Sequence, residues 1–286
     1  PDKPNVAVPD RNYDILTLHL DLDLKFKARA IGGTARYTVA QLSEGDFVLD
    51  QVALDIASVL VDGEEATFRT PGDRLVIDMP ERVTRGGQAD VLIHYTATPR
   101  KGLHFRDVVR GSPDSYPEVW TQGQKNDNRY WFPAWDHPND RFDYTGEVRG
   151  PQGWTVHTNS GMNLPAYLIM IAAGPYQEMG DETNLVLAGP NVSRKGMERV
   201  WAPIPDMMEH FEKRTGVAYP WGTFRQFFVQ RFMYGGMENT GAVINTDGVL
   251  TSAPVDETRD RIQSLVAHEL AHQWYGDYLT CRSWRD

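Results

Sequence analysis

Two histidines and a glutamate near the end of the chain have the types and the spacing needed to bind and use a metal ion. The segment His268-Glu269-Leu270-Ala271-His272 matches the pattern H-E-x-x-H. Side chains four positions apart on an α-helix project from one face, so both imidazoles can reach a single ion. Zinc accepts such nitrogen ligands at about 2.0–2.1 Å and keeps one position open at catalytic sites. We therefore predict one Zn²⁺ per chain, with His268 and His272 as ligands.

Glu269 has a different predicted role from the two histidines. It follows the first ligand and lies three positions before the second, so its carboxylate flanks the metal-binding face. A carboxylate at that place can take a proton from water at the metal and later deliver it to a leaving amine. The alternative is that these three residues merely share a helix and have no common chemistry. The helical context of the motif favours the metal site.

A second segment with possible binding chemistry lies upstream, at Tyr234-Gly235-Gly236-Met237-Glu238-Asn239. Two adjacent glycines let another backbone approach closely, because no Cβ stands in the way. A peptide could pair with this segment as an added strand, and Glu238 could hold its positively charged amine. The alternative is a simple turn, which is the commoner role of a Gly-Gly step.

Both segments fall among elements of mixed helix and strand. A helix is predicted from Asp256 or Thr258 to Tyr275, with Ile262, Leu265 and Val266 on its buried stripe and Gly276 at its end. Residues 205–215 form a shorter predicted helix capped by Gly216, and residues 224–232 a predicted strand. We expect an α/β region that contains both motifs.

The first part of the chain has the pattern of a β domain. Apolar residues occupy every even position from Leu16 to Phe26, which is the period of a half-buried strand. Similar short runs follow at residues 47–49, 52–61, 74–79 and 90–96, separated by turn-forming pairs such as Asp62-Gly63. The pattern predicts an antiparallel β domain at residues 1–180 and a second domain at 181–286, with the boundary near residues 175–185.

Composition excludes several classes of partner. The 286 residues carry a net charge of −10, which argues against nucleic acid and anionic membranes, since both reward a basic face. The longest apolar stretch, residues 166–173, is too short to span a bilayer. The single cysteine, Cys281, excludes an internal disulfide and a cysteine zinc cage. We expect a soluble protein whose compartment the sequence leaves open, with the cytoplasm favoured over export.

The two motifs together resemble the aminopeptidase N family of gluzincin zinc peptidases, which also includes leukotriene-A hydrolase. In that family a G-x-M-E-N segment precedes an H-E-x-x-H-x-W helix by about thirty residues, and here residues 235–239 precede residues 268–274 at that spacing. Weaker matches are the segment Thr121-Gln122-Gly123-Gln124, and Arg129 with residues 131–136.

The resemblance implies a multidomain fold in which an N-terminal antiparallel β saddle domain precedes the first part of a thermolysin-like α/β catalytic domain. It also implies that the free α-amine of a peptide is held by Glu238, and that the peptide path is lined by Gly235, Gly236 and Met237. Gln122 and Gln124 are further predicted substrate-binding residues. Gln124 stands where many members have a second amine-binding glutamate.

The resemblance also implies parts that lie beyond Asp286. The third zinc ligand of the family is a glutamate that would fall at position 291, and a transition-state-stabilising tyrosine and helical C-terminal parts would follow. The expected function is that of a zinc-dependent aminopeptidase acting on peptides with a free N-terminus. The alternatives are an epoxide hydrolase similar to leukotriene-A hydrolase and a non-catalytic scaffold of the same fold.

Overall fold

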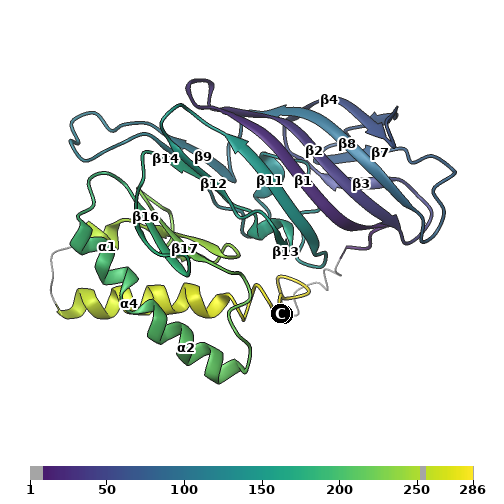
Figure 1. Ribbon diagram of the computed structural model, residues 1–286. Helices are drawn as coiled ribbons and strands as arrows, with labels where there is room; N and C mark the ends of the chain where they lie inside the picture. The colour runs from purple at the N-terminus through teal and green to yellow at the C-terminus, as the bar shows by residue number, and fades with distance from the viewer. Residues whose placement is uncertain (1–8, 252–255, 286) are drawn as a thin grey trace, which may run out of the picture.

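The structure, a computed structural model, describes residues 9–251 and 256–285 and has two regions (Figure 1). A large β region forms the upper right of the view, and a smaller α/β region with the helices lies at the lower left. The β region therefore precedes the α/β region along the chain, in the predicted order.

A seven-stranded sheet forms one layer of the β region. Its strand order is β13-β11-β1-β2-β8-β4-β5. The long strand β1 has the predicted alternation from Leu18 to Leu24, where the even positions are buried and the residues between them are more exposed. The prediction is wrong at its two ends, because a β-bulge between Ile15 and Thr17 buries Ile15 in place of Leu16, and Phe26 lies in a 3₁₀ turn. The strand bounds are Tyr13–Lys25 (β1), Ala30–Gln41 (β2), Leu54–Val61 (β4), Glu64–Glu65 (β5), Gln88–Ala97 (β8), Phe142–Arg149 (β11) and Met162–Leu164 (β13).

One strand pair of this sheet departs from the predicted antiparallel arrangement. β1 and β11 run parallel, with Thr17 opposite Asp143 and Asp23 opposite Arg149. Between β8 and β11 the chain forms two strands of another sheet and a 3₁₀ turn. β11 then pairs with the edge of β1 that β2 leaves open, and it enters the sheet at the end where β1 begins. The two-residue period is the same in parallel and antiparallel strands, and the sequence pattern therefore carried no information on direction.

Two smaller sheets complete the β region. The three-stranded sheet has the order β3-β7-β6, and the four-stranded sheet the order β12-β14-β10-β9. Runs 47–49 and 74–79 were predicted as strands, and β3 and β7 confirm them. The bounds are Phe47–Asp50 (β3), Phe68–Arg69 (β6), Arg74–Ile77 (β7), Leu103–Arg106 (β9), Glu118–Thr121 (β10), Thr155–Thr158 (β12) and Ile171–Gly174 (β14).

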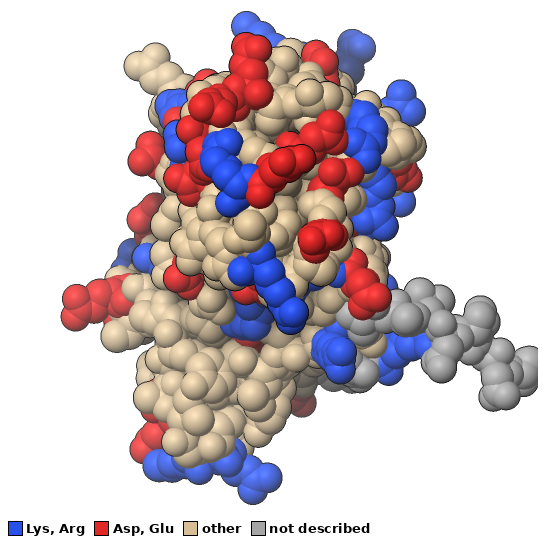
Figure 2. Space-filling view, turned by 90° about the vertical axis from the view of Figure 1, so that its right-hand side faces the viewer, with Lys and Arg blue, Asp and Glu red and all other residues tan. Residues whose placement is uncertain are grey.

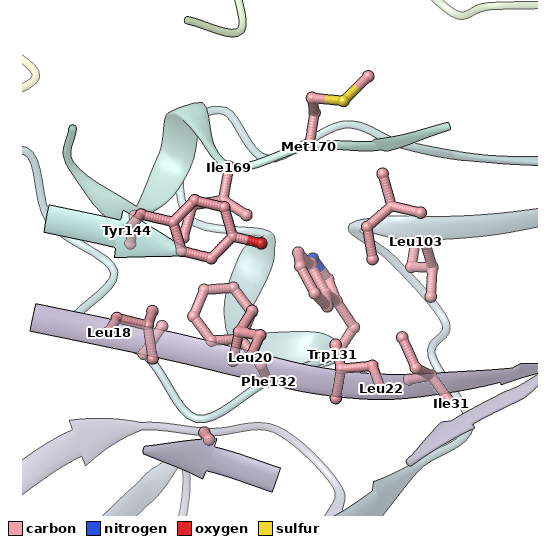
Figure 3. Packing of buried hydrophobic residues seen from close by; sticks show 14 of the residues in the cluster. Leu18, Leu20, Leu22, Ile31, Leu103, Trp131, Phe132, Tyr144, Ile169 and Met170 are labelled. Atoms are coloured by element: carbon pink, nitrogen blue, oxygen red, sulfur yellow. The ribbon is translucent and has the colours of Figure 1, made fainter. Parts of the chain in front are cut away.

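The core of the β region fills the space between these layers. Figure 3 shows Trp131 and Phe132 between the leucines of β1 and the segment that carries Ile169 and Met170. The indole and the phenyl ring have no exposed surface. Arg129 anchors the same segment, because its Nε donates to Asp136 at 3.1 Å and its Nη2 to Asp50 at 3.2 Å. Residues 128–136 thus have a structural role, as the internal support of the strands that lead to Gln122.

A five-stranded mixed sheet is the centre of the second region. Its order is β15-β16-β17-β19-β18; β16, β17 and β19 are parallel to one another, and the two outer strands are antiparallel to their neighbours. The bounds are Gln177–Gly180 (β15), Asn184–Ala188 (β16), Phe224–Val229 (β17), Gly236–Met237 (β18) and Ala242–Thr246 (β19). One face packs on the helices and the other on the β region, which is why Phe227 and Phe228, on opposite faces of β17, are both buried.

The helices cover one face of this sheet (Figure 1). Their bounds are Arg194–Trp201 (α1), Ile204–Thr215 (α2), Gly248–Thr251 (α3) and Asp256–His272 (α4). α2 ends at Gly216, whose φ of 70° is the left-handed conformation that its position predicts. In α4, Ile262 and Val266 are buried as predicted, and Leu265 is half-buried. α1 was not predicted.

The predicted end of α4 at Tyr275 is three residues too long. The helix proper ends at His272, and the next turn tightens: the N–H groups of Gln273 and Trp274 donate to the carbonyls of Leu270 and Ala271, three residues back. Gly276, with a φ of 139°, then turns the chain away.

Two of the sequence predictions, against nucleic acid and against a membrane span, concern the surface and the helices. On the face in Figure 2, acidic and basic side chains are interspersed over the β region and form no basic patch. Exposed ion pairs in this region include Arg69 with Asp46. In the part of the chain that the structure describes, no helix is long and apolar enough to cross a membrane. The 180/181 domain boundary remains a proposal.

Candidate active site

The two predicted motifs lie against each other in the structure. β18 is the outer strand of the five-stranded sheet, and α4 passes beneath it. A Cβ added to Gly236 would overlap the carboxyl group of Glu269 and lie 2.6 Å from Oδ1 of Asn245. Gly236 is therefore needed for packing: its missing side chain makes room for the glutamate of the H-E-x-x-H motif. Gly235 meets the Cδ1 of Leu265, at 3.2 Å from an added Cβ.

The imidazoles of His268 and His272 converge as the spacing predicts. Their Nε2 atoms are 3.1 Å apart, and the ring planes are nearly perpendicular, at 86°. Nδ1 of His272 lies 2.9 Å from the carbonyl oxygen of Tyr275. A proton on Nδ1 is held there by that carbonyl, which leaves the Nε2 lone pair of His272 directed toward His268.

Glu269 and Glu238 form a pair of buried carboxyl groups beside the histidines. Glu269 is 3% exposed and Glu238 is 7% exposed. Burial, with a smaller contribution from the charge of Glu238, raises the pKa of Glu269 to about 8. The two carboxyl groups are thus close enough for the charge of Glu238 to affect Glu269.

The backbone around Glu238 is fixed by amide side chains. Gln273 Nε2 donates to the carbonyl oxygen of Glu238 at 3.3 Å, and its Oε1 accepts from the N–H of Gly241 at 2.8 Å. Asn239 Nδ2 donates to the carbonyl oxygen of Leu168 at 3.2 Å. These bonds tie the segment after β18 to the end of α4 and to the β region, so the backbone that carries the Glu238 side chain is fixed.

Of the two predicted glutamines, Gln122 reaches the site by a defined contact. Its Nε2 lies 3.4 Å from the sulfur of Met237, the side chain is buried, and its Oε1 has no hydrogen-bond partner among the described residues. An unpartnered carbonyl oxygen beside Met237 can accept a bond from a ligand. Gln124 is exposed two residues further on. Both remain proposed substrate-binding residues.

Asp277 is a buried acid that the sequence interpretation did not single out. Its side chain has no exposed surface, and burial followed by the charge of Glu238 raises its pKa well above its usual range. Arg141 lies next to it and donates from Nη1 to its carbonyl oxygen at 2.5 Å. Gln273 was also missed. In the sequence, Gln273 and Asp277 were marked only by their position just after the H-E-x-x-H motif, and their residue types alone did not indicate a place in the site.

The donor set fits a zinc ion. Two nitrogen ligands about 2.0–2.1 Å from one tetrahedral ion are about 3.3 Å apart, close to the observed 3.1 Å between the Nε2 atoms. Three buried acids, Glu238, Glu269 and Asp277, lie close enough together that the charge of Glu238 helps to raise the pKa of the other two. Within residues 9–251 and 256–285, no set of three or more His, Cys, Asp or Glu side chains is arranged to hold a metal by itself. The fit therefore rests on the two histidines.

Comparison with protein families identifies matches over most of the chain. A family model described as the peptidase M1 N-terminal domain matches residues 9–163, and one described as the peptidase family M1 domain matches residues 203–286. The second match contains both the Glu238 segment and the histidine motif.

Curated relatives include both activities that the motifs suggested. The chain is 27% identical to leukotriene A-4 hydrolase of Xenopus laevis, over 100% of this chain and 51% of that protein. It is 27% identical to aminopeptidase N of Streptomyces lividans, over 93% of this chain and 34% of that protein. Human aminopeptidase B is 26% identical, over 96% and 48%. The chain thus spans about half the length of these relatives, or less.

Solved structures share the fold. Native yeast LTA4 hydrolase superimposes with a TM-score of 0.84 at 24% sequence identity, covering 96% of this chain and 46% of that one. The yeast enzyme in complex with bestatin gives 0.81 at the same identity, covering 97% and 47%. The arrangement of a β region followed by the start of a catalytic domain is therefore that of these structures.

Proposed function

The chain belongs to peptidase family M1, and from this premise we propose that the full-length protein is a zinc-dependent aminopeptidase that removes the N-terminal residue from peptides. Membership of this family indicates a hydrolase that acts on peptides. The finer assignment, to zinc and to the N-terminal residue, is our inference from the site.

One observation carries the proposal, namely that a strand edge, a buried acid and a histidine pair meet at one point. Gly236 lies on the Glu269 carboxyl group, Glu238 follows two residues later, and His268 precedes Glu269 directly. A peptide paired with the free edge of β18 would place its backbone over this point. Its amine and its first peptide bond would then face different side chains.

Each side chain has a separate proposed task. His268 and His272 would hold zinc, together with the glutamate expected at position 291. When bound, zinc would supply a Lewis acid for the scissile carbonyl and a more acidic water. Glu269 would accept a proton from the attacking water and donate it to the leaving amine, because its carboxyl group lies beside the histidines without being needed as a ligand. Glu238 would hold the ammonium group.

Binding of the substrate amine by Glu238 explains why only the N-terminal residue would be removed. A buried carboxylate is stabilised by an ammonium group that replaces its lost hydration. The rigid backbone around Glu238, held by Gln273 and Asn239, fixes the distance between that carboxylate and the histidine pair. A peptide that enters with its amine at Glu238 therefore presents only its first peptide bond.

Two other functions share parts of this site. An epoxide hydrolase would use the same histidine pair, and leukotriene A-4 hydrolase is among the relatives. A scaffold would need none of the chemistry, and the intact His268, Glu269 and His272 count against it. We favour the aminopeptidase because the buried acid at Glu238 has a direct purpose in binding an amine.

The test uses the full-length protein. We expect one zinc per chain by elemental analysis, hydrolysis of alanine and leucine anilides, and no hydrolysis of N-acetylated forms. His268→Ala and His272→Ala should each empty the metal site, whereas His210→Ala, a change on α2, should retain zinc. A protein that holds no zinc would be a scaffold, and one that opens lipid epoxides but leaves aminoacyl anilides intact would be an epoxide hydrolase.

A further inference from the structure

Two arginines lie near each other where β9 of the β region meets residues 230–237, the active-site segment that leads to Glu238. β9 and β10 pair antiparallel, with Arg106 opposite Glu118 and His104 opposite Trp120. The guanidinium of Arg106 lies over the Trp120 ring, with its Cζ 4.8 Å from the ring centre. The Trp120 ring in turn packs edge-on against Phe232, with ring centres 5.1 Å apart. Arg106 is thus held on the surface that meets residues 230–237.

Arg231 comes from the active-site segment itself and lies beside the same surface. Its Nη2 donates to the carbonyl oxygen of Asp107 at 3.2 Å, so it is adjacent to the end of β9. Burial, and then the positive charge of Arg231, lowers the pKa of Arg106. Two positive groups from different regions of the chain therefore share one location.

Neither guanidinium has an acidic partner among the described residues. The ion pairs within 4.0 Å include none with Arg106 or Arg231, and the nearby carboxylate of Asp107 is paired with Arg29 instead. Nε of Arg106 is buried and has no hydrogen-bond partner in the described part of the chain. A buried N–H donor without an acceptor is costly, and an anion would satisfy it.

The two neighbouring acids do not cancel this charge. Glu118 uses both oxygens internally, accepting from the N–H of Gln230 at 2.8 Å and from the hydroxyl of Tyr176 at 3.1 Å. Burial raises the pKa of Glu118 to about 8, so it is largely neutral at pH 7. Burial also raises the pKa of Asp247, to about 6, and its carboxylate makes no ion pair with Arg231 within 4.0 Å. The location keeps an excess of positive charge.

The arginines lie on the line that a bound peptide would follow. β10 and residues 230–237 run in the same direction, because Glu118 contacts Gln230 at one end and Gln122 contacts Met237 at the other. A peptide with its amine at Glu238, antiparallel to β18, would run toward the Gln230 end. From Gln122 back to Glu118 is four strand positions, or about 13 Å at about 3.3 Å per residue. A peptide of about four residues covers the same length.

From these contacts we propose that Arg106 and Arg231 bind the carboxylate at the far end of the substrate, so that the enzyme prefers short peptides of about three to four residues with a free C-terminus. The proposal rests on the proposed aminopeptidase function. It adds a specificity site that reads the end of the peptide opposite to Glu238.

The test measures binding apart from turnover. In the full-length protein carrying Glu269→Gln, calorimetry would compare tetra-alanine with its C-terminal amide. We expect the free acid to bind about tenfold more tightly, since a charge-assisted pair is lost in the amide. Adding Arg231→Gln, or separately Arg106→Gln, should bring that ratio close to one. Arg36→Gln, a change at an exposed arginine of β2, is the matched control and should leave the ratio unchanged.

A second pair of peptides distinguishes the two sources of a carboxylate. The amides of Ala-Ala-Ala-Asp and Ala-Ala-Ala-Asn differ only in a side-chain charge, and we expect a smaller preference for the aspartate than for the free C-terminus. Equal binding of tetra-alanine and its amide would overturn the proposal, as would a preference that survives both arginine changes. Failure of the aminopeptidase function itself would be recognised separately, as no cleavage of alanine anilide by the unmodified protein.

Discussion

Removing the Glu238 carboxylate should abolish the preference for a free amine. The side chain is 7% exposed, so an ammonium group bound there exchanges water for a buried, oppositely charged partner. A hydrogen bond to a charged group contributes about 1.5–3 kcal/mol, which corresponds to about 10- to 150-fold in kcat/KM. Glu238→Ala should therefore lower kcat/KM on alanine anilide by about that factor.

The structure also suggests how to separate this effect from a structural one. Gln273 donates a hydrogen bond to the carbonyl oxygen of Glu238, and the side chain of Asn239 donates one to the carbonyl oxygen of Leu168. Glu238→Gln leaves both bonds in place and keeps the side-chain volume while it removes the charge. Glu178→Gln, an exposed position on β15, is the matched control and should change nothing.

The assay is the ratio of kcat/KM on free tri-alanine to that on N-acetyl-tri-alanine, measured with the full-length protein. We expect a large ratio in the unmodified protein and a ratio near one in both Glu238 variants. If Glu238→Gln retains the full preference for the free amine, the amine is recognised elsewhere and the role assigned to this carboxylate is wrong.

Three further changes test other parts of the account. Gly236→Ala should lower kcat at least about tenfold with folding retained, because the new methyl group displaces the Glu269 carboxyl group; unchanged kcat would show that this contact is unimportant. Gln124→Glu should lower KM for unblocked substrates several-fold by adding about 1 kcal/mol of attraction for the amine, and a KM that does not fall would place residue 124 outside the amine site. Burial raises the pKa of Glu118 from an ordinary 4.5 to about 8, so its ionisation destabilises the fold progressively as pH rises from about 4.5 to 8. Glu118→Gln should thus raise the melting temperature relative to the unmodified protein more at pH 8 than at pH 5, and an equal difference at both pH values would contradict the assigned burial.

The sequence predicted the elements that carry the active-site motif because local patterns determine them. The four-residue spacing of His268 and His272 fixes their common helix face, and the alternation in β1 fixes its buried side. Gly216 marked the end of α2 for the same reason, since one residue conformation decides it.

Features that depend on tertiary structure could not be predicted in this way. The parallel pairing of β1 with β11 depends on the path of the chain between them, and a two-residue period has no direction. Gly236 looked like an opening for a substrate backbone, whereas the structure also places the Glu269 carboxyl group against it. Arg106 and Arg231 are far apart in the sequence and meet only because β9 packs beside the active-site segment.

The most direct test of the central claim is the turnover of alanine anilide by the full-length Glu269→Gln variant, at a zinc content shown to equal that of the unmodified protein. Glutamine keeps the shape of the side chain but cannot accept a proton from water. We expect kcat to fall at least about a thousandfold, with zinc retained. Near-normal turnover by this variant would contradict the account, because the residue buried beside the histidine pair would then have no part in the reaction.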